Sequence, residues 1–502
     1  MADAAIVRSV PAPVGGWNSR DSIAAMKPTD APIMDNFFPD STVVRLRSGN
    51  EVFCENIGSG SATVETLVAY AQQTTSHFLA AAAGKIFQIS SGSGSQIATG
   101  FTNNRWQAVP NFNGYAILVN GADTPRSYSG SAIATIALSG SGLTSSNLIH
   151  VNEWKGRLFF TEKDKSVAWY LPVGQIAGSC ASLDFSTVFK NGGYLVGMAN
   201  WTRDGGSGPD DLAVFLSSKG EAAVYSGTDP SSSTTWSLVG VFRMGAPIGR
   251  RSFVKVGSDV VVLTTDGYIQ LSKALPVART ESAPDLSDKI SEAVQSAVSS
   301  YMGNFGWEAV QHAAQRMLVV NVPTATNSTA QQHVVNTNTG AWCRFTGWNA
   351  NTFCVFEDEL YFGGSDGTVY KAMTGESDNG ANIVGDVQQA FSRFGLDFFK
   401  QFLQVRPLIA SNGVVAPAIA MNVDYQDVAA TGTPVQTTPN GALWDTVLWD
   451  TTAWGSDSLV AADWLAVEGL GYSGAIRMRI AVNAITFQWA ATEIMFRKSA
   501  QM

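Results

Sequence analysis

The sequence predicts an all-β protein, and three observations lead to that prediction. Short runs of alternating apolar and polar residues recur from about residue 50 to the C-terminus. Tight turns separate them, most clearly Asp266-Gly267 and Asp366-Gly367, because Asp-Gly between two apolar runs favours a hairpin. The chain also contains 48 glycines and only 15 % charged residues. A turn-rich β chain explains this composition, and large subunit interfaces, whose centres are depleted in charge, are the alternative explanation.

The strands between residues 51 and 375 repeat one theme, which predicts a β-propeller. The segments 260–269 and 359–370 both contain an apolar strand, small residues, Asp-Gly and a second strand with an aromatic residue. Propeller blades of four strands recur about every 40–50 residues, so this region would hold roughly seven blades. A pair of β-sandwiches is the alternative architecture.

One amphipathic helix is predicted near 287–302, inside the propeller region. Its apolar stripe consists of Ile290, Ala293, Val294, Ala297, Val298 and Tyr301, at helical spacing. Asp285, Ser287 and Asp288 are suited to its start and Gly303 to its end. The stripe can pack on the propeller or on a neighbouring subunit.

The remaining residues predict two further parts. Residues 1–50 form an irregular N-terminal platform or docking segment, because prolines and glycines interrupt any strand pattern at its start. Residues 376–502 form a smaller C-terminal β domain. Within it, Trp444, Trp449 and Trp454 recur every five residues, which fits neither a strand nor a helix. We predict a Trp-rich loop whose rings pack on this domain.

The charge and hydropathy of the chain exclude several classes of protein. The net charge is −9 and no run of Lys and Arg is present, so the chain is not expected to hold DNA through its phosphates. Neither a signal peptide nor a membrane-spanning segment is recognisable.

No catalytic, cofactor-binding or metal-binding residue is assigned from the sequence, and we predict that the protein is not an enzyme. The cysteines lack metal-ligand spacing. A serine nucleophile needs a sharp strand–turn–helix elbow such as GxSxG, whereas Gly92-Ser93-Gly94 and Gly140-Ser141-Gly142 lie in Ser/Gly-rich stretches that indicate turns. The isolated histidines are predicted to be turn or surface residues. They are His77, His150, His312 and His333.

The N-terminal segment carries a resemblance to a known family. It reads Gly15-Gly16-Trp17-Asn18-Ser19-Arg20-Asp21, then Asp30-Ala31-Pro32-Ile33-Met34-Asp35-Asn36-Phe37-Phe38-Pro39, then Arg45-Leu46-Arg47-Ser48-Gly49. This pattern resembles the opening of the tail nozzle (tail tubular) proteins of short-tailed bacteriophages. The resemblance is sharp over residues 13–50 and diffuse elsewhere.

The resemblance implies a structural virion protein of the viral tail. Six identical subunits would form a ring that docks on the tail adaptor protein, and double-stranded DNA would pass transiently through its lumen during ejection. Tail fibres or spikes are further partners that it implies, with assembly in the host cytoplasm. The alternative is a carbohydrate-binding or carbohydrate-hydrolysing β-propeller of a virion or cell surface.

Six residues of this segment are candidates for an interface: Arg20, Asp21, Phe37, Phe38, Arg45 and Arg47. Adjacent phenylalanines are too apolar to remain exposed, since each ring can bury roughly 150–250 Å². We expect the segment to meet another subunit or the adaptor, with an internal staple as the alternative. Arg45 and Arg47 would face a DNA channel, pair with acids or stay solvated.

Overall fold

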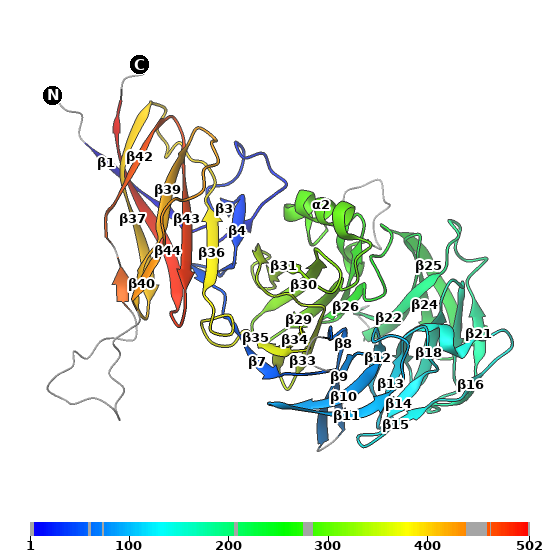
Figure 1. Cartoon of the computed structure of the whole chain (residues 1–502). Helices are drawn as coiled ribbons and strands as arrows, with labels where there is room; N and C mark the ends of the chain where they lie inside the picture. Colours follow the sequence, from blue (N-terminus) through cyan, green and yellow to red (C-terminus); the bar gives the residue numbers. More distant parts are fainter. Residues whose placement is uncertain are drawn as a thin grey trace. The chain divides into compact units, whose positions relative to one another are not determined.

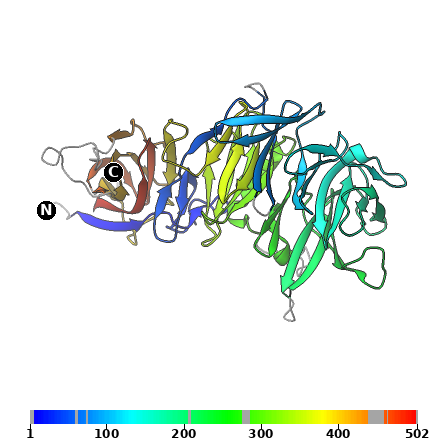
Figure 2. The same ribbon diagram turned by 90° about the horizontal axis from the view of Figure 1, so that it is seen from below.

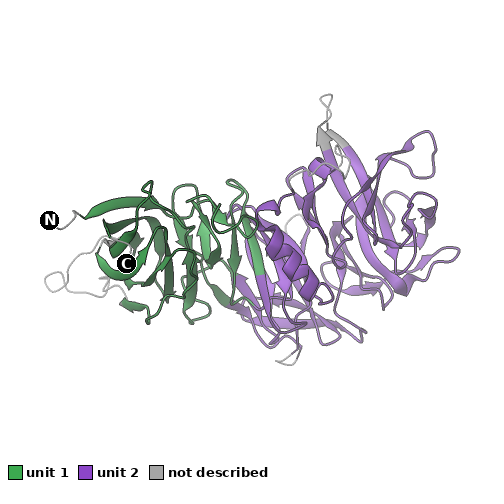
Figure 3. Cartoon of the chain, turned by 90° about the horizontal axis from the view of Figure 1, so that it is seen from above, with its two compact units in different colours: residues 1–51, 332–348, 372–502 green, residues 52–331, 349–371 purple. Residues whose placement is uncertain are grey.

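The computed structural model describes residues 5–58, 62–72, 75–204, 209–274, 285–437, 459–461 and 463–499. The chain divides into two compact units, which Figure 3 shows in different colours. Unit 1 comprises residues 1–51, 332–348 and 372–502, and unit 2 comprises residues 52–331 and 349–371. Strands dominate both units, so the predicted all-β class is confirmed (Figure 1).

Unit 2 is a β-propeller whose sheets follow one another along the chain (Figures 1 and 2). The first two sheets are β8 (Thr66–Gln72), β9 (Thr75–Ala82), β10 (Lys85–Ser90), β11 (Ser93–Thr99), then β12 (Gln107–Phe112), β13 (Tyr115–Val119), β14 (Arg126–Tyr128), β15 (Ile133–Thr135). The next two are β17 (Leu148–Trp154), β18 (Arg157–Glu162), β19 (Val167–Tyr170), β21 (Ala181–Asp184), then β22 (Leu195–Asp204), β23 (Pro209–Ser217), β24 (Glu221–Gly227), β25 (Trp236–Arg243). The last three contain β26 (Phe253–Val256), β27 (Asp259–Thr264), β28 (Gly267–Gln270), then β29 (Glu308–His312), β30 (Met317–Pro323), then β33 (Thr352–Phe356), β34 (Glu359–Gly363), β35 (Val369–Ala372) with β7 (Asn50–Cys54).

The first strands of these sheets form a closed ring. Strand β8 contacts β12, β12 contacts β17, and β17 contacts β22; β22 contacts the fifth sheet, β26 contacts β29, β29 contacts β33, and β33 returns to β8. Within the described residues this ring contains seven sheets, which confirms the predicted propeller and its blade number. Strand β7 lies beside β35, so the segment that opens unit 2 completes the sheet that closes it.

The core of the propeller lies between neighbouring sheets. Val68, Leu79 and Ile86 of the first sheet pack with Trp106 and Leu118 at the second. Equivalent clusters join the second sheet to the third, the third to the fourth, the fourth to the fifth and the seventh to the first. Each sheet therefore depends on its neighbours for burial of its apolar faces.

The two Asp-Gly turns and the helix lie where the sequence predicts them. Gly267 and Gly367 have φ angles of 145° and 77°, which explains why glycine occupies these turns. Helix α2 (Ser291–Tyr301) follows a short 3-10 turn, η2 (Asp288–Ile290), and contacts β28 and β30 of unit 2. Its stripe thus packs on the propeller. Ser287 is the N-cap residue of η2 and Asp288 lies in its first turn, as predicted. The Ser287 side chain makes no capping hydrogen bond, however, because its hydroxyl accepts the Tyr268 amide N–H at 2.9 Å.

Unit 1 contains two main sheets. One has the order β41-β37-β44-β6-β5, with β1 beside β44 and β42 beside β37; the other, within unit 1, has the order β31-β32-β4-β36-β43-β39. Their strands are β1 (Ile6–Pro11), β4 (Ile33–Asp35), β5 (Phe37–Pro39), β6 (Val44–Leu46), β31 (Ala330–Asn336, in unit 1 from residue 332), β32 (Trp342–Phe345), β36 (Ile383–Gln388), β37 (Lys400–Ser411), β39 (Ala418–Val423), β41 (Leu459–Ala461), β42 (Leu465–Gly471), β43 (Gly474–Val482) and β44 (Phe487–Lys498). Side chains from both sheets, including Phe402, Ile476 and Ile494, form one core.

The structure groups the predicted parts differently. The propeller extends from residue 52 to residue 371, close to the predicted bounds, but residues 332–348 belong to unit 1. Residues 1–51 are not a separate segment: β1 pairs with β44 along its whole length, and β6 also pairs with β44. The N-terminal segment and the C-terminal domain are therefore one unit. The predicted Trp-rich loop lies outside the described residues.

Phe37 and Phe38 are core residues of unit 1. Their exposed fractions are 0 % and 1 %. The Phe37 ring meets Phe487 edge to face at 5.8 Å between centroids, and the Phe38 ring lies 6.4 Å from Phe345. The internal staple, one of the two alternatives, accounts for both rings without a partner protein.

Truncating Phe37 should destabilise unit 1. We expect Phe37→Ala to lower the free energy of unfolding by about 3–5 kcal/mol, because a buried ring is lost and a cavity remains. Val7→Ala, at a 43 % exposed position of the same unit, should change it by less than about 0.5 kcal/mol. Urea unfolding of both variants, followed by tryptophan fluorescence, gives the comparison. Equal midpoints would contradict the core assignment.

Candidate functional site

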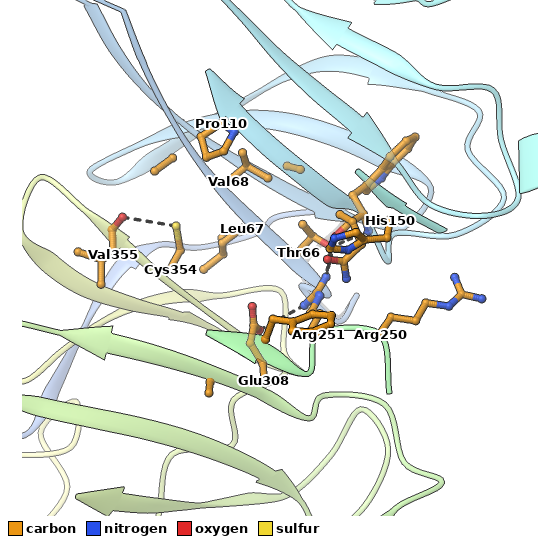
Figure 4. A pocket seen from close by; sticks show the side chains of 16 residues that line it. Thr66, Leu67, Val68, Pro110, His150, Arg250, Arg251, Glu308, Cys354 and Val355 are labelled. Carbon is orange, nitrogen blue, oxygen red and sulfur yellow. Dashed lines mark hydrogen bonds and ion pairs between the residues drawn. The ribbon is translucent and has the colours of Figure 1, made fainter. Parts of the chain in front are cut away.

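A cavity of about 290 Å³ lies inside the ring of first strands in unit 2 (Figure 4). It is lined from β8, β12, β17 and β29, from β33, and from the segment that leads into β26. A second cavity of about 460 Å³ shares Gln107, Arg250 and Arg251 with the first and is lined further by residues 102–105 and 302–307. We call the two together the axial cavity.

Arg251 is the central residue of the axial cavity. Its side chain is 8 % exposed. Nη2 donates to the carbonyl of Glu65 (3.0 Å), to Thr66 Oγ1 (2.7 Å) and to the carbonyl of Trp106 (3.0 Å). Nη1 donates to Glu308 Oε2 (3.3 Å) and Thr352 Oγ1 (3.1 Å), and Figure 4 shows the guanidinium between Thr66 and Glu308. One side chain thus joins the fifth sheet to the first, second, sixth and seventh.

Arg250 differs sharply from its neighbour. Figure 4 shows the two side chains extending in different directions. Its one hydrogen bond within the described chain is from Nη1 to the carbonyl of Asn120, at 3.4 Å. Burial lowers the pKa of Arg250, with Tyr194 and Asp164 acting in the opposite direction and Arg105 in the same direction. Arg250 is therefore a partly desolvated cation without an ion pair among the described residues.

Both carboxylates of the axial cavity are already engaged. Glu65 Oε1 accepts from Arg105 Nε at 3.0 Å, and Glu308 Oε2 accepts the Phe353 amide N–H at 3.1 Å in addition to Arg251. Arg105 also lies over the Phe305 ring, 4.2 Å from its centroid. Neither carboxylate is placed as a free acid facing a second one, the arrangement that glycoside hydrolysis needs.

His150 lines the inner part of the cavity. Its Nε2 lies 2.9 Å from the Met198 carbonyl, so this nitrogen carries the proton and Nδ1 is an acceptor. Burial lowers the pKa of His150 to about 4. Gly197 makes room for the ring, because a Cβ there would lie 3.2 Å from the imidazole. The imidazole is thus neutral near pH 7.

Two residues that line the smaller cavity carry a buried polar atom without a hydrogen-bond partner in the described chain. These atoms are His150 Nδ1 and Trp106 Nε1. Trp106 is 2 % exposed. Because an unsatisfied buried polar group costs about 1–3 kcal/mol, such groups point to a bound water or ligand.

Sequence analysis did not identify any residue of the axial cavity as functional. The prediction that the histidines are turn or surface residues is wrong, since all four lie in strands and His312 and His333 are buried. The adjacent arginines Arg250-Arg251, in a chain with few charges, were the available signal. Their separate roles depend on contacts with distant residues, which spacing does not reveal.

The interface candidate Arg47 lies instead in a buried network of unit 1. All five of its N–H groups are used: two to Asp378 (2.8 and 2.6 Å), one to Asn36 Oδ1 (2.8 Å), and one each to the carbonyls of Ser48 (3.0 Å) and Thr346 (2.8 Å). The guanidinium also lies 4.7 Å from the Trp348 ring centroid. Arg47 therefore faces neither solvent nor a channel in the folded unit.

Two buried asparagines of the N-terminal pattern also make hydrogen bonds within unit 1. Asn36 has a φ of 59° and donates from Nδ2 to Thr346 Oγ1 (2.9 Å) and the Val384 carbonyl (2.8 Å). Asn18 donates from Nδ2 to both Asp21 and Asp30, each at 2.9 Å. These polar residues therefore fix the backbone of unit 1 from inside.

Three interface candidates retain exposed surface. Arg20 and Asp21 form an ion pair (2.8 Å) whose side chains are 45 % and 30 % exposed. Arg45 pairs with Asp40 (3.0 Å), lies 4.6 Å from the Phe38 centroid and is 21 % exposed. Their role in an interface stays a prediction.

Within the described ranges, no three His, Cys, Asp or Glu side chains come together as a metal site, and no helix is long and apolar enough to span a membrane. All four cysteines are free thiols.

Replacing Arg251 should destabilise the propeller far more than replacing Arg250. Arg251→Met leaves Glu308 and several acceptors unpaired, so we expect a loss of about 3–5 kcal/mol. Arg250→Met removes one long hydrogen bond and should cost less than about 1 kcal/mol. Chemical denaturation of both variants measures the difference, and similar losses would contradict the central role of Arg251.

Acid should weaken the fold through His150. The His150 imidazole binds a proton near pH 6.5 in the unfolded chain, but its pKa in the folded chain is about 4. Its contribution to stability is therefore fully present above pH 6.5 and is lost as the pH falls toward 4. Between pH 7 and pH 4.5, the free energy of unfolding of the wild type should fall by on the order of 2 kcal/mol more than that of His150→Gln, because glutamine does not titrate. Urea unfolding at pH 7 and pH 4.5 tests this. Parallel pH dependences would show that His150 is not the group responsible.

Comparisons with known proteins concern the fold. No family model matches the chain, and no curated protein matches it. Among solved structures, the chain is similar to YCF48 from Cyanidioschyzon merolae, with 10 % identity over 62 % of this chain and 96 % of that one and a TM-score of 0.37. It is similar to PorZ, a surface component of the type-IX secretion system of Porphyromonas gingivalis, with 11 % identity and a TM-score of 0.37. The match covers 65 % of this chain and 38 % of PorZ. It is also similar to the extracellular domain of BT4673 from B. thetaiotaomicron, with 10 % identity and a TM-score of 0.43. The match covers 86 % of this chain and 61 % of that domain.

Proposed function

We propose that the chain is a structural subunit of the tail of a short-tailed bacteriophage, and that several copies form the nozzle ring through which DNA leaves. The observation that carries the proposal is the N-terminal pattern from Gly15 to Gly49, which resembles nozzle proteins. Its residues Asn18, Asn36 and Arg47 are buried. Asn18 binds Asp30, and Arg47 binds Asn36 and Asp378. The pattern is long and rich in unusual residues, so chance is a poor explanation of the resemblance.

In this proposal the DNA channel lies between subunits. The axial cavity of the propeller is of small-molecule size and is crossed by Arg251, so a duplex cannot pass through it. A lumen must therefore be enclosed by several copies of the chain. The net charge of −9 suits such a lumen, because DNA that has to slide should not adhere to its wall.

The proposal assigns no catalytic step to the chain. Glu65 and Glu308 are engaged by arginines. The chain would dock on a tail adaptor through the exposed part of unit 1, where Arg20 and Asp21 remain our candidates. Tail fibres or spikes would attach elsewhere on the ring.

Assembly tests this function. The purified full-length chain, alone or with the adaptor protein, should form closed rings in negative-stain images and a matching oligomer in mass photometry. Arg20→Glu should reduce ring or adaptor binding, since it reverses one charge of the exposed pair, whereas Arg8→Glu, an exposed control in the same unit, should not. Monomers under both conditions would contradict the proposal.

A further inference from the structure

We propose that the axial cavity of the propeller binds a small polyhydroxylated acid, that is, a sugar-like molecule bearing one carboxylate or phosphate group. Arg250, assisted by Arg105, would bind the anionic group, and His150 and Trp106 of the smaller cavity would bind hydroxyl groups. The proposal is independent of ring assembly.

The anionic part follows from the charges that line the cavity. The lining residues include Arg105, Arg250 and Arg251 but only two carboxylates, Glu65 and Glu308. Arg105 and Arg251 bind these two carboxylates at 3.0 and 3.3 Å. Arg250 is left with a backbone carbonyl at 3.4 Å. In a chain of net charge −9, a partly buried arginine without a carboxylate is a ready site for an oxyanion.

The position of Arg105 strengthens this site. Arg105 and Arg250 both line the larger cavity, and the charge of Arg105 contributes to lowering the pKa of Arg250. The Glu65 carboxylate and the Phe305 ring hold Arg105 in place. An anion bound between the two guanidinium groups would relieve their repulsion without rearranging either partner.

The hydroxyl part follows from the unpartnered buried groups. His150 offers an acceptor at Nδ1 because its Nε2–H is donated to Met198, and Trp106 offers a donor at Nε1. Hydroxyl groups both donate and accept, so a ligand with several of them satisfies this mixed set, whereas an apolar ligand or a bare anion does not.

The size of the cavity limits the ligand to a small molecule. Volumes of about 460 and 290 Å³ suit one or two sugar rings and exclude a folded protein segment or a nucleic-acid duplex. The carboxylate of a sugar acid and the phosphate of a sugar phosphate share the required chemistry. The binding experiment below distinguishes a sugar acid from a sugar phosphate.

Isothermal titration calorimetry of the full-length protein provides the test. D-Glucuronate and glucose 6-phosphate are the probes, and glucose and inorganic phosphate are the controls. We expect at least one acidic sugar to bind, and to bind about tenfold or more tightly than glucose and than phosphate. Arg250→Gln should weaken that binding about tenfold, whereas Arg243→Gln, an exposed arginine of β25 outside the cavity, should not.

A second variant tests the hydroxyl contacts. His150→Phe removes the acceptor, so it should weaken binding of the acidic sugar and leave any binding of inorganic phosphate unchanged. Thermal melting establishes that each variant is folded, and Arg250→Lys replaces Arg250→Gln if the latter is not. Binding of phosphate alone would overturn the sugar assignment. Absence of binding for both acidic sugars at millimolar concentration, or equal affinity in Arg250→Gln and Arg243→Gln, would overturn the proposal.

Discussion

The hydrogen bonds of Arg251 are the contacts on which the propeller depends most directly. A ring of sheets buries its apolar faces pairwise, so each sheet is positioned only by its two neighbours. Arg251 adds contacts of another kind, because one guanidinium reaches the first, second, sixth and seventh sheets from a segment that leads into the fifth. Carbonyl and hydroxyl groups that would otherwise face an empty axis are satisfied, and the axis is closed to large molecules.

Unit 1 uses a second arginine for the same purpose. Arg47 joins the N-terminal segment to the loop at Asp378 and to the strand end at Thr346. Both arginines are nearly inaccessible and both bind main-chain carbonyls as well as a carboxylate. A guanidinium group is planar and its donors have fixed directions, so it specifies one arrangement of its acceptors. The chain has only 32 lysines and arginines, and two of the arginines, Arg47 and Arg251, hold distant segments together.

The sequence was informative where local chemistry determines structure. The Asp-Gly turns, the period of the strands and the stripe of α2 all depend on neighbours within a few residues, and each is found where expected. The grouping of residues 1–51 with 372–502 was not predicted, because pairing such as Ile6 with Phe496 leaves no local trace. Phe37 and Phe38 were recognised as buried, but the pattern could not distinguish a partner protein from Phe487 and Phe345. The axial cavity was missed because its lining residues are scattered along the sequence from Glu65 to Val355.

The pairing of the two ends of the chain has a consequence for biosynthesis. Strands β5 and β6 are synthesised long before β44, which pairs with β6. At roughly 5–20 residues per second, translation of the intervening chain takes on the order of tens of seconds. During that interval Phe37 and Phe38 lack their final neighbours, while the sheets of unit 2 can already form. The nascent chain must therefore carry the apolar segment around Phe37 and Phe38 until β44 has been made, and its yield should depend on chaperones that shield this segment during that interval.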